Sequence, residues 1–174
     1  MGKFLALLLL ACAAGGGALM YYQQVYAYYD EVEPNGETDV QITSMITDAP
    51  ELVLYDDFRA IDATSSPIRY RACFNTSMSH AMLTETYVLD DGAVPLTAPG
   101  WFDCFDAREI GAAIEVGEAL AFTGTENIEY GIDRVVAIHE DGRGWVWDQL
   151  NRCGEIVFDG NRAPDDCPEP PEGY

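Results

Sequence analysis

The segment IDRVVAIHEDGRGWVWDQ, residues 132–149, has the pattern of a β-hairpin. Two runs rich in valine and tryptophan flank Asp141-Gly142, a pair typical of two-residue type I′ turns. We therefore expect strands near 132–139 and 144–149, with Ile138 opposite Trp145 and Val136 opposite Trp147. One face would carry Val136, Ile138, Trp145 and Trp147, and the other Val135, Ala137, His139, Val146 and Asp148. Both indoles are expected on the buried face, because their apolar area favours burial.

A second hairpin is predicted earlier in the chain. In IRYRACF, residues 68–74, apolar side chains alternate with Arg69, Arg71 and Cys73, which is the period of a half-buried strand. Residues 64–67, TSSP, would join this strand to the apolar run at 58–63. Weaker patterns predict further strands at 40–46, 52–55, 87–89 and 120–123.

Helix signals are strongest at residues 106–116. Asp106 can cap the start, Glu109 can complete a capping box, and Gly117 supplies the left-handed residue that ends many helices. A short helix is also expected at 77–84, capped by Ser77 or Ser79. Together these patterns predict an α+β fold: an N-terminal transmembrane helix, then one domain with a mainly antiparallel sheet and one or two short helices.

The transmembrane helix is predicted from the apolar run FLALLLLACAAGGGALM, residues 4–20. Lys3 precedes the run, and the tyrosine-rich segment 21–29, YYQQVYAYY, follows it, where the interfacial aromatic belt of a membrane helix belongs. We expect an uncleaved helix to about residue 27, with a cytoplasmic N-terminus in the bacterial inner membrane. The expected parts are an anchor at 1–29, a polar stem at 30–39 and a periplasmic α+β domain at 40–174 with a Pro-rich tail.

Two other interpretations of the same run remain open. A cleaved signal peptide would use Ala11 and Ala13 as its A-x-A site, although its apolar core would be short. Lipidation of Cys12 is the third interpretation, because Leu9-Leu10-Ala11-Cys12 loosely follows the pattern of a bacterial lipobox. All three interpretations send the remainder of the chain out of the cytosol.

The charge of that remainder limits the partners it can bind. From residue 30 onward the chain holds all 30 acidic side chains and eight arginines, a formal charge of −22. Such a surface repels nucleic acid and anionic headgroups, so a nucleic-acid-binding protein is excluded. It suits cations or a basic partner, and it also keeps an exported protein soluble.

Cysteine usage agrees with export. Apart from Cys12, the chain has Cys73, Cys104, Cys153 and Cys167, an even set that reads as a disulfide framework with three pairings. Their order along the chain favours Cys73–Cys104 and Cys153–Cys167. No C-x-x-C pair occurs in the sequence, so neither a zinc ribbon nor a thioredoxin-type site is supported.

Three stretches carry a resemblance to a known family: MYYQQVYAYYDEV, APGWFDCFDA and YGIDRVVAIHEDGRGWVWDQLNRCGEIVFDG. They resemble an uncharacterised family of small, singly anchored alphaproteobacterial envelope proteins, which is known as a domain of unknown function. The resemblance covers nearly the whole chain and implies an inner-membrane setting. It implies no reaction, ligand or catalytic residue.

Catalytic chemistry has few candidates in this chain. His80 and His139 are its two histidines, and an anchored periplasmic hydrolase using either one is the alternative function. No G-x-S-x-G elbow accompanies them. The acidic pairs Asp56-Asp57, Asp90-Asp91 and Asp165-Asp166 do not follow the calcium-loop pattern. We expect no cofactor, no metal site and no catalytic residue.

An aromatic segment supplies the best binding candidate. Trp101 and Phe102 follow Pro99-Gly100 and lie close to Cys104, whose disulfide would hold the loop rigid. Rigid exposed aromatics bind partners, whereas the alternative is that both rings fill the core above the next helix. We therefore expect a protein-interaction or structural module of the envelope, with an unknown protein partner.

Overall fold

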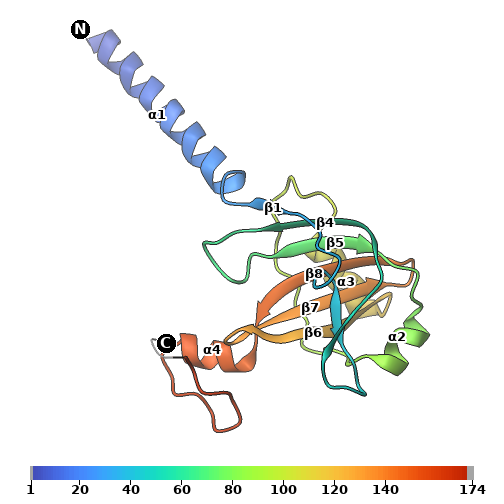
Figure 1. The fold of residues 1–174 in the computed structure, drawn as a ribbon. Coiled ribbons are helices and arrows are strands. Elements are labelled where there is room, and N and C mark those ends of the chain that lie inside the picture. Colours follow the sequence, from blue (N-terminus) through green and yellow to red (C-terminus); the bar gives the residue numbers. More distant parts are fainter. Residues whose placement is uncertain (1, 172–174) are drawn as a thin grey trace.

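The structure is a computed structural model that describes residues 2–171 (Figure 1). Its helices are α1 (Gly2–Val25), α2 (His80–Thr86), α3 (Ala107–Val116) and α4 (Arg152–Phe158). Its strands are β1 (Asp30–Val32), β2 (Gln41–Thr43), β3 (Pro50–Leu52), β4 (Asp56–Asp62), β5 (Arg71–Asn75), β6 (Ala119–Glu129), β7 (Ile132–His139) and β8 (Arg143–Leu150).

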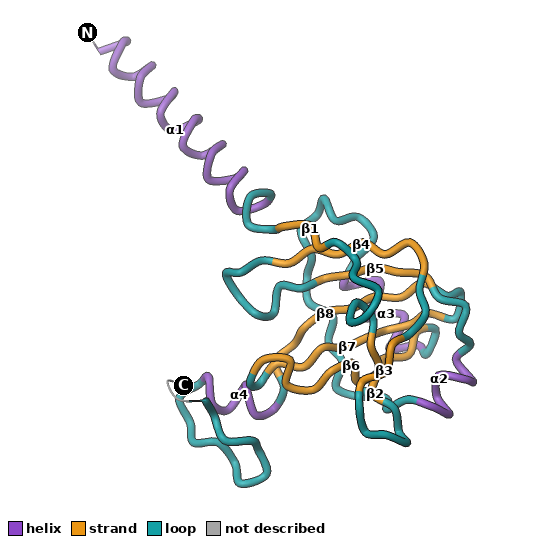
Figure 2. Tube along the Cα trace, in the orientation of Figure 1, coloured by secondary structure: helices purple, strands orange, loops and turns teal. Residues whose placement is uncertain are grey.

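Six of the strands form one antiparallel sheet in the order β1-β4-β5-β8-β7-β6. β2 and β3 form a separate two-stranded ribbon that lies beside β6 (Figure 2). There the Thr43 hydroxyl donates to the Gly124 carbonyl at 2.8 Å. α1 projects away from the sheet domain (Figure 1). The predicted α+β class, with an N-terminal apolar helix and a mainly antiparallel sheet, is confirmed.

The hairpin of β7 and β8 exists, but its predicted register is wrong by one residue. Ile138 lies opposite Gly144, Ala137 opposite Trp145 and Val135 opposite Trp147. The loop between the strands therefore spans residues 140–142, and Gly142 takes a φ of 93° while its N–H donates to the His139 carbonyl at 2.9 Å. Three-residue hairpin loops commonly place such a left-handed residue last, so Asp141-Gly142 marked the turn without fixing its length.

The corrected register changes which residues share a face. Trp145 and Trp147 lie on one buried face, as predicted, with exposed fractions of 4% and 0%. Their neighbours there are Val135 and Ala137, whereas the predicted neighbours Val136 and Ile138 lie on the opposite face with Val146. Both faces of the central strands are therefore buried.

We name the two sides the Trp face and the Val146 face. The Trp face is covered by α3 and the loop before it, through Phe102, Phe105, Ile110 and Ala113. The Val146 face is covered by the β2–β3 ribbon with the residues that flank it and by α2, through Val40, Ile42, Val53 and Leu83. The main sheet is thus the middle layer. α3 and the loop before it cover one face, and the β2–β3 ribbon and α2 cover the other.

α3 forms where the sequence predicted it. Asp106 accepts from the N–H groups of Arg108 and Glu109, and Gly117 ends the helix with a φ of 79°. The predicted capping box does not form, because the Glu109 carboxylate accepts a hydrogen bond from Arg143 instead, at 3.0 Å. This ion pair links α3 to the first residue of β8.

The other local predictions are partly met. Residues 56–62 and 71–75 pair as the second hairpin, and Ser79 caps α2. The expected strand at 87–89 makes only isolated bridges, and α4, capped by Asn151, was not predicted. Within the segment 30–39, which we expected as a stem, Asp30–Val32 pairs with β4 as the edge strand of the main sheet.

Both predicted disulfides are present. Cys73–Cys104 joins β5 to the loop before α3, with a Cα–Cα distance of 6.2 Å. Cys153–Cys167 joins α4 to the Pro-rich tail, with a Cα–Cα distance of 5.8 Å. The first bridge fixes the loop that carries Trp101 and Phe102 against the Trp face.

We predict that Trp147→Ala lowers the free energy of unfolding by about 3–5 kcal/mol. The indole is fully buried, meets Phe105 edge-on at a centroid distance of 6.2 Å, and would leave a cavity. Urea unfolding of the full chain in detergent measures the change. Ile46→Ala is the control, because that side chain is 87% exposed. Equal stability of the two variants would show that the indole does not hold the core together.

Candidate functional site

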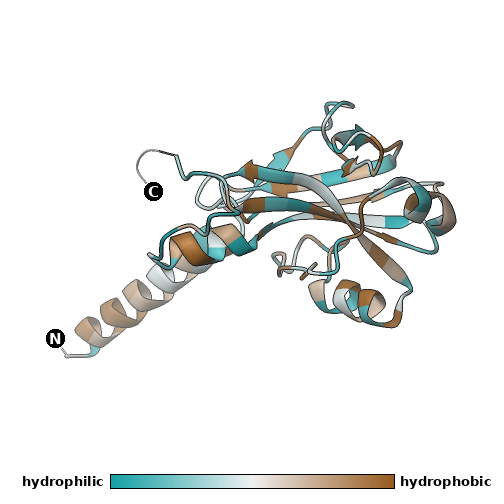
Figure 3. Ribbon diagram, turned by 90° about the horizontal axis from the view of Figure 1, so that it is seen from below, coloured by the Kyte–Doolittle hydropathy of each residue, from teal (hydrophilic) through white to brown (hydrophobic). Residues whose placement is uncertain are grey.

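The apolar helix α1 leaves its side chains uncovered. None of its residues is buried, and Figure 3 shows hydrophobic residues along its N-terminal part. Within residues 2–171 it is the one helix long and apolar enough to cross a membrane, judged on length and composition. An exposed apolar surface of this extent needs a cover, and the other described residues do not provide one.

The C-terminal end of α1 is held against the domain by aromatic side chains. Trp101 donates its indole N–H to the carbonyl of Val25, the last residue of the helix, and so satisfies a group that a helix end leaves unpaired. The indole also stacks on Tyr26 at a centroid distance of 6.2 Å and meets Tyr29 edge-on at 6.2 Å. We call Tyr26, Tyr29, Trp101 and Phe102 the aromatic junction.

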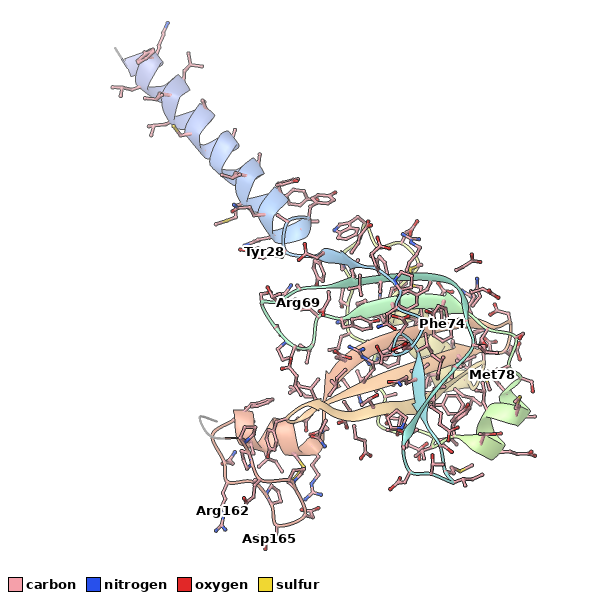
Figure 4. The ribbon with its side chains drawn as sticks, viewed as in Figure 1. Tyr28, Arg69, Phe74, Met78, Arg162 and Asp165 are labelled. Carbon is pink, nitrogen blue, oxygen red and sulfur yellow. A yellow bond between two sulfur atoms is a disulfide. The ribbon has the colours of Figure 1, made fainter. Side chains whose placement is uncertain are left out.

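Arginines support this junction from two sides. The Arg69 guanidinium lies 5.7 Å from the centre of the Tyr29 ring, and Figure 4 shows Arg69 in the loop between β4 and β5. Arg59 lies 5.4 Å from the centre of the Phe102 ring and pairs with Asp103 at 2.9 Å. Each contact is a cation–π interaction that adds to the packing of the rings.

The two aromatic residues singled out from the sequence have different positions. Phe102 is 3% exposed and belongs to the core of the Trp face, as the core-filling interpretation had it. Trp101 is half-buried and reaches the surface. Of the pair, Trp101 is therefore the side chain that an external partner can touch.

A groove opens beside the junction, at the edge of the main sheet. Its volume is about 400 Å³, and its lining comes from β1, β4 and the loop before α3: Glu31, Val32, Glu33, Pro34, Phe58, Arg59, Ala60, Ile61, Trp101 and Phe102. Ile61 and Phe102 are buried, whereas Glu31 and Glu33 are exposed. We call it the β1 groove; it has an apolar floor and an acidic rim.

The length of β1 explains the groove. β1 pairs with Ala60–Asp62 only, so among the described residues no strand lies outside the first half of β4. Pro34 follows two residues after β1 and cannot donate a further ladder hydrogen bond. A sequence signal existed, because Pro34-Asn35-Gly36 predicts a turn, but nothing in the sequence placed it beside Trp101.

A second, polar cavity of about 420 Å³ contains a buried ion pair that the sequence did not reveal. Arg134 donates two hydrogen bonds to Asp148, at 2.8 and 3.1 Å, and its guanidinium lies 3.8 Å from the centre of the Tyr70 ring. Burial raises the pKa values of Asp148 and Tyr70, although the neighbouring guanidinium opposes both shifts. Arg134 lies directly opposite Asp148 in the ladder, so the pair helps to fix the β7–β8 register.

The two histidines lie apart from both cavities. His80 begins α2, and its Nε2 is hydrogen-bonded to the Ile138 carbonyl at 2.9 Å. The His139 Nδ1 lies 3.0 Å from an Asp141 carboxylate oxygen, and its Nε2 lies 3.9 Å from Glu118. No hydrogen bond from a serine to either ring is found in the described part of the chain, so neither histidine is paired with the nucleophile of a Ser–His hydrolase. The described residues also contain no cluster of His, Cys, Asp and Glu that could hold a metal ion.

We predict that Asp148→Asn destabilises the protein by about 3–5 kcal/mol, because Arg134 would remain buried with its carboxylate partner removed. The double variant Arg134→Leu/Asp148→Leu should regain most of this loss, since it removes both charges from the interior. Urea unfolding of the full chain measures both effects. A double variant no more stable than Asp148→Asn would contradict the argument.

We also predict that Trp101→Phe loosens the junction while keeping an aromatic ring in it. Loss of the indole N–H leaves the Val25 carbonyl without this donor, so amide exchange should accelerate in residues 26–29. Hydrogen exchange followed by mass spectrometry, on protein in detergent micelles, measures this. Tyr28→Phe is the matched control, because Tyr28 is 50% exposed and lies outside the junction. Unchanged exchange in Trp101→Phe would show that the hydrogen bond does not hold the helix end.

Comparison with known proteins identifies a family but no activity. Residues 40–168 match the model of a family of unknown function, DUF6446. No curated protein and no solved structure matches the chain. The matched region includes the strands β2 to β8, α4 and all four disulfide-bonded cysteines, and it begins after β1. The chain therefore belongs to the DUF6446 family of unknown function.

Proposed function

We propose that this chain is an inner-membrane protein of bacteria, anchored by α1, whose periplasmic domain binds a partner protein and has no catalytic role. The observation that carries the interaction is the position of Trp101. It reaches the surface at an open groove, on a loop held by the Cys73–Cys104 disulfide and by the aromatic junction. Rigid, partly exposed aromatics of this kind are frequent anchors of protein interfaces.

The dimensions of α1 support the anchor. Its 24 residues rise about 36 Å as an α-helix, enough to cross a hydrocarbon core of about 30 Å. Tyr21, Tyr22 and Tyr26 lie at its C-terminal end with large exposed fractions, as interfacial tyrosines do. Lys3 at the other end favours a cytoplasmic N-terminus.

Export of the domain is supported by its chemistry. Disulfides persist in oxidising compartments, and the domain has two. The hydrolase alternative has no comparable support, because among the described residues no hydrogen bond joins either histidine ring to a serine.

The anchor is tested by the intact mass of protein extracted from membranes. We expect the mass of the uncleaved chain, because α1 is retained. A mature chain beginning at Ala14, or at a diacylated Cys12, would overturn the anchor and leave a secreted or lipid-attached domain.

The interaction is tested by photo-crosslinking in cells, with a benzophenone amino acid placed at Pro34, an exposed and uncharged residue of the groove lining. We expect a discrete adduct that survives purification. The same probe at Glu126, an exposed position on β6, is the control and should give none. Absence of any adduct at Pro34, or the same adducts at both positions, would refute a partner at this groove.

A further inference from the structure

We propose that the β1 groove binds an extended, basic segment of its partner and accommodates a lysine or arginine side chain between the acidic rim and Trp101. This inference rests on the proposed function and names the chemistry of the partner.

The charges of the groove are unevenly compensated. Arg59 is the one basic residue in its lining, and its guanidinium is already paired with Asp103 and stacked on Phe102. Among the described residues no salt bridge involves Glu31 or Glu33, which stand two residues apart on the rim. A cationic side chain would meet two carboxylates that no neighbour neutralises.

The lining of the groove suits the rest of such a side chain. Ile61 and Phe102 offer an apolar floor to the methylene groups of lysine or arginine, which favour apolar surface along their length. Trp101 offers an indole, the side chain that attracts cations best among the aromatics. The groove therefore matches both parts of a long basic side chain.

The backbone of the partner is expected to be extended because the groove follows a sheet edge. β1 is the outermost strand of the sheet and has three residues, so an incoming strand can lie alongside it. Such edges are normally protected by charge, and this one carries Asp30, Glu31 and Glu33.

The same charges exclude a second copy of this chain as the occupant. Two β1 strands paired antiparallel would bring their carboxylates together across the ladder, and like charges in that position are destabilising. The whole chain has a formal charge of −21, so copies also repel each other at a distance. A basic partner would instead be attracted by the carboxylates of β1 and by the negative charge of the whole chain.

The test measures binding of a dye-labelled peptide of alternating lysine and valine to the full chain in neutral detergent micelles. Fluorescence anisotropy should show saturable binding, and a peptide of alternating glutamate and valine should not bind. The variant Glu31→Gln/Glu33→Gln should weaken the affinity at least ~10-fold, because it removes the rim charges and keeps the side-chain shape.

The matched control is Glu115→Gln/Glu126→Gln, which removes two exposed carboxylates from α3 and β6 and changes the net charge equally. It should alter the affinity by less than ~2-fold at physiological salt. Equal weakening by both double variants would assign the binding to overall charge and overturn the groove. Sedimentation as a dimer, without peptide binding, would assign the groove to a second copy and likewise overturn it.

The result of the peptide-binding test can be distinguished from the result of the crosslinking test. A crosslink at Pro34 without binding of the basic peptide would retain a partner at the groove and refute its basic chemistry. Rim-dependent peptide binding without any crosslink in cells would support the groove's cation preference while refuting the proposed partner. Absence of both the crosslink and the rim-dependent peptide binding refutes the inference and the proposed interaction together.

Discussion

The pairing of β7 with β8 is the constraint on which the rest of the domain depends. These strands are the fourth and fifth of the six in the main sheet, and the position of Gly142 sets their register through one turn of three residues. That register sends both indoles to the Trp face and brings Arg134 opposite Asp148. A slip of one residue would exchange the two faces and put the ion pair out of reach.

The Trp face in turn determines where the surface site lies. α3 and the loop before it cover the indoles, and the Cys73–Cys104 disulfide ties that loop to β5. Phe102 enters the core, so its neighbour Trp101 is left at the sheet edge beside β1. One short loop therefore supplies both a core residue, Phe102, and the binding candidate, Trp101.

Local chemistry predicted much of the fold. The capped helix at Asp106, the hairpin of β4 and β5 and both disulfides follow from residue types and chain order. The β7–β8 register could not be predicted, because Asp-Gly suits loops of two and of three residues and the valines on both faces look alike. With the wrong register, Asp148 falls opposite Val135, so the ion pair with Arg134 stayed hidden.

The candidate site was predictable only in part. Trp101 stood out by its composition and its nearness to a cysteine, but its hydrogen bond to Val25 joins residues 76 positions apart. The groove rim belongs to a segment that looked like a linker, since Asp30, Glu31 and Glu33 leave Val32 as its single apolar residue and so give no strand signal. Long-range contacts of this kind depend on the whole topology, which single segments do not encode.

The bond between Trp101 and the end of α1 has a mechanical consequence. A domain on a flexible tether samples a volume above its attachment point, and its effective concentration for a partner falls as the tether lengthens. Here β1 begins five residues after α1 ends, and the aromatic junction fills the interval. An anchored chain of this build would present its groove at one height and one angle above the bilayer. It would thereby select partners by how far their basic segment stands from the membrane, in addition to its sequence.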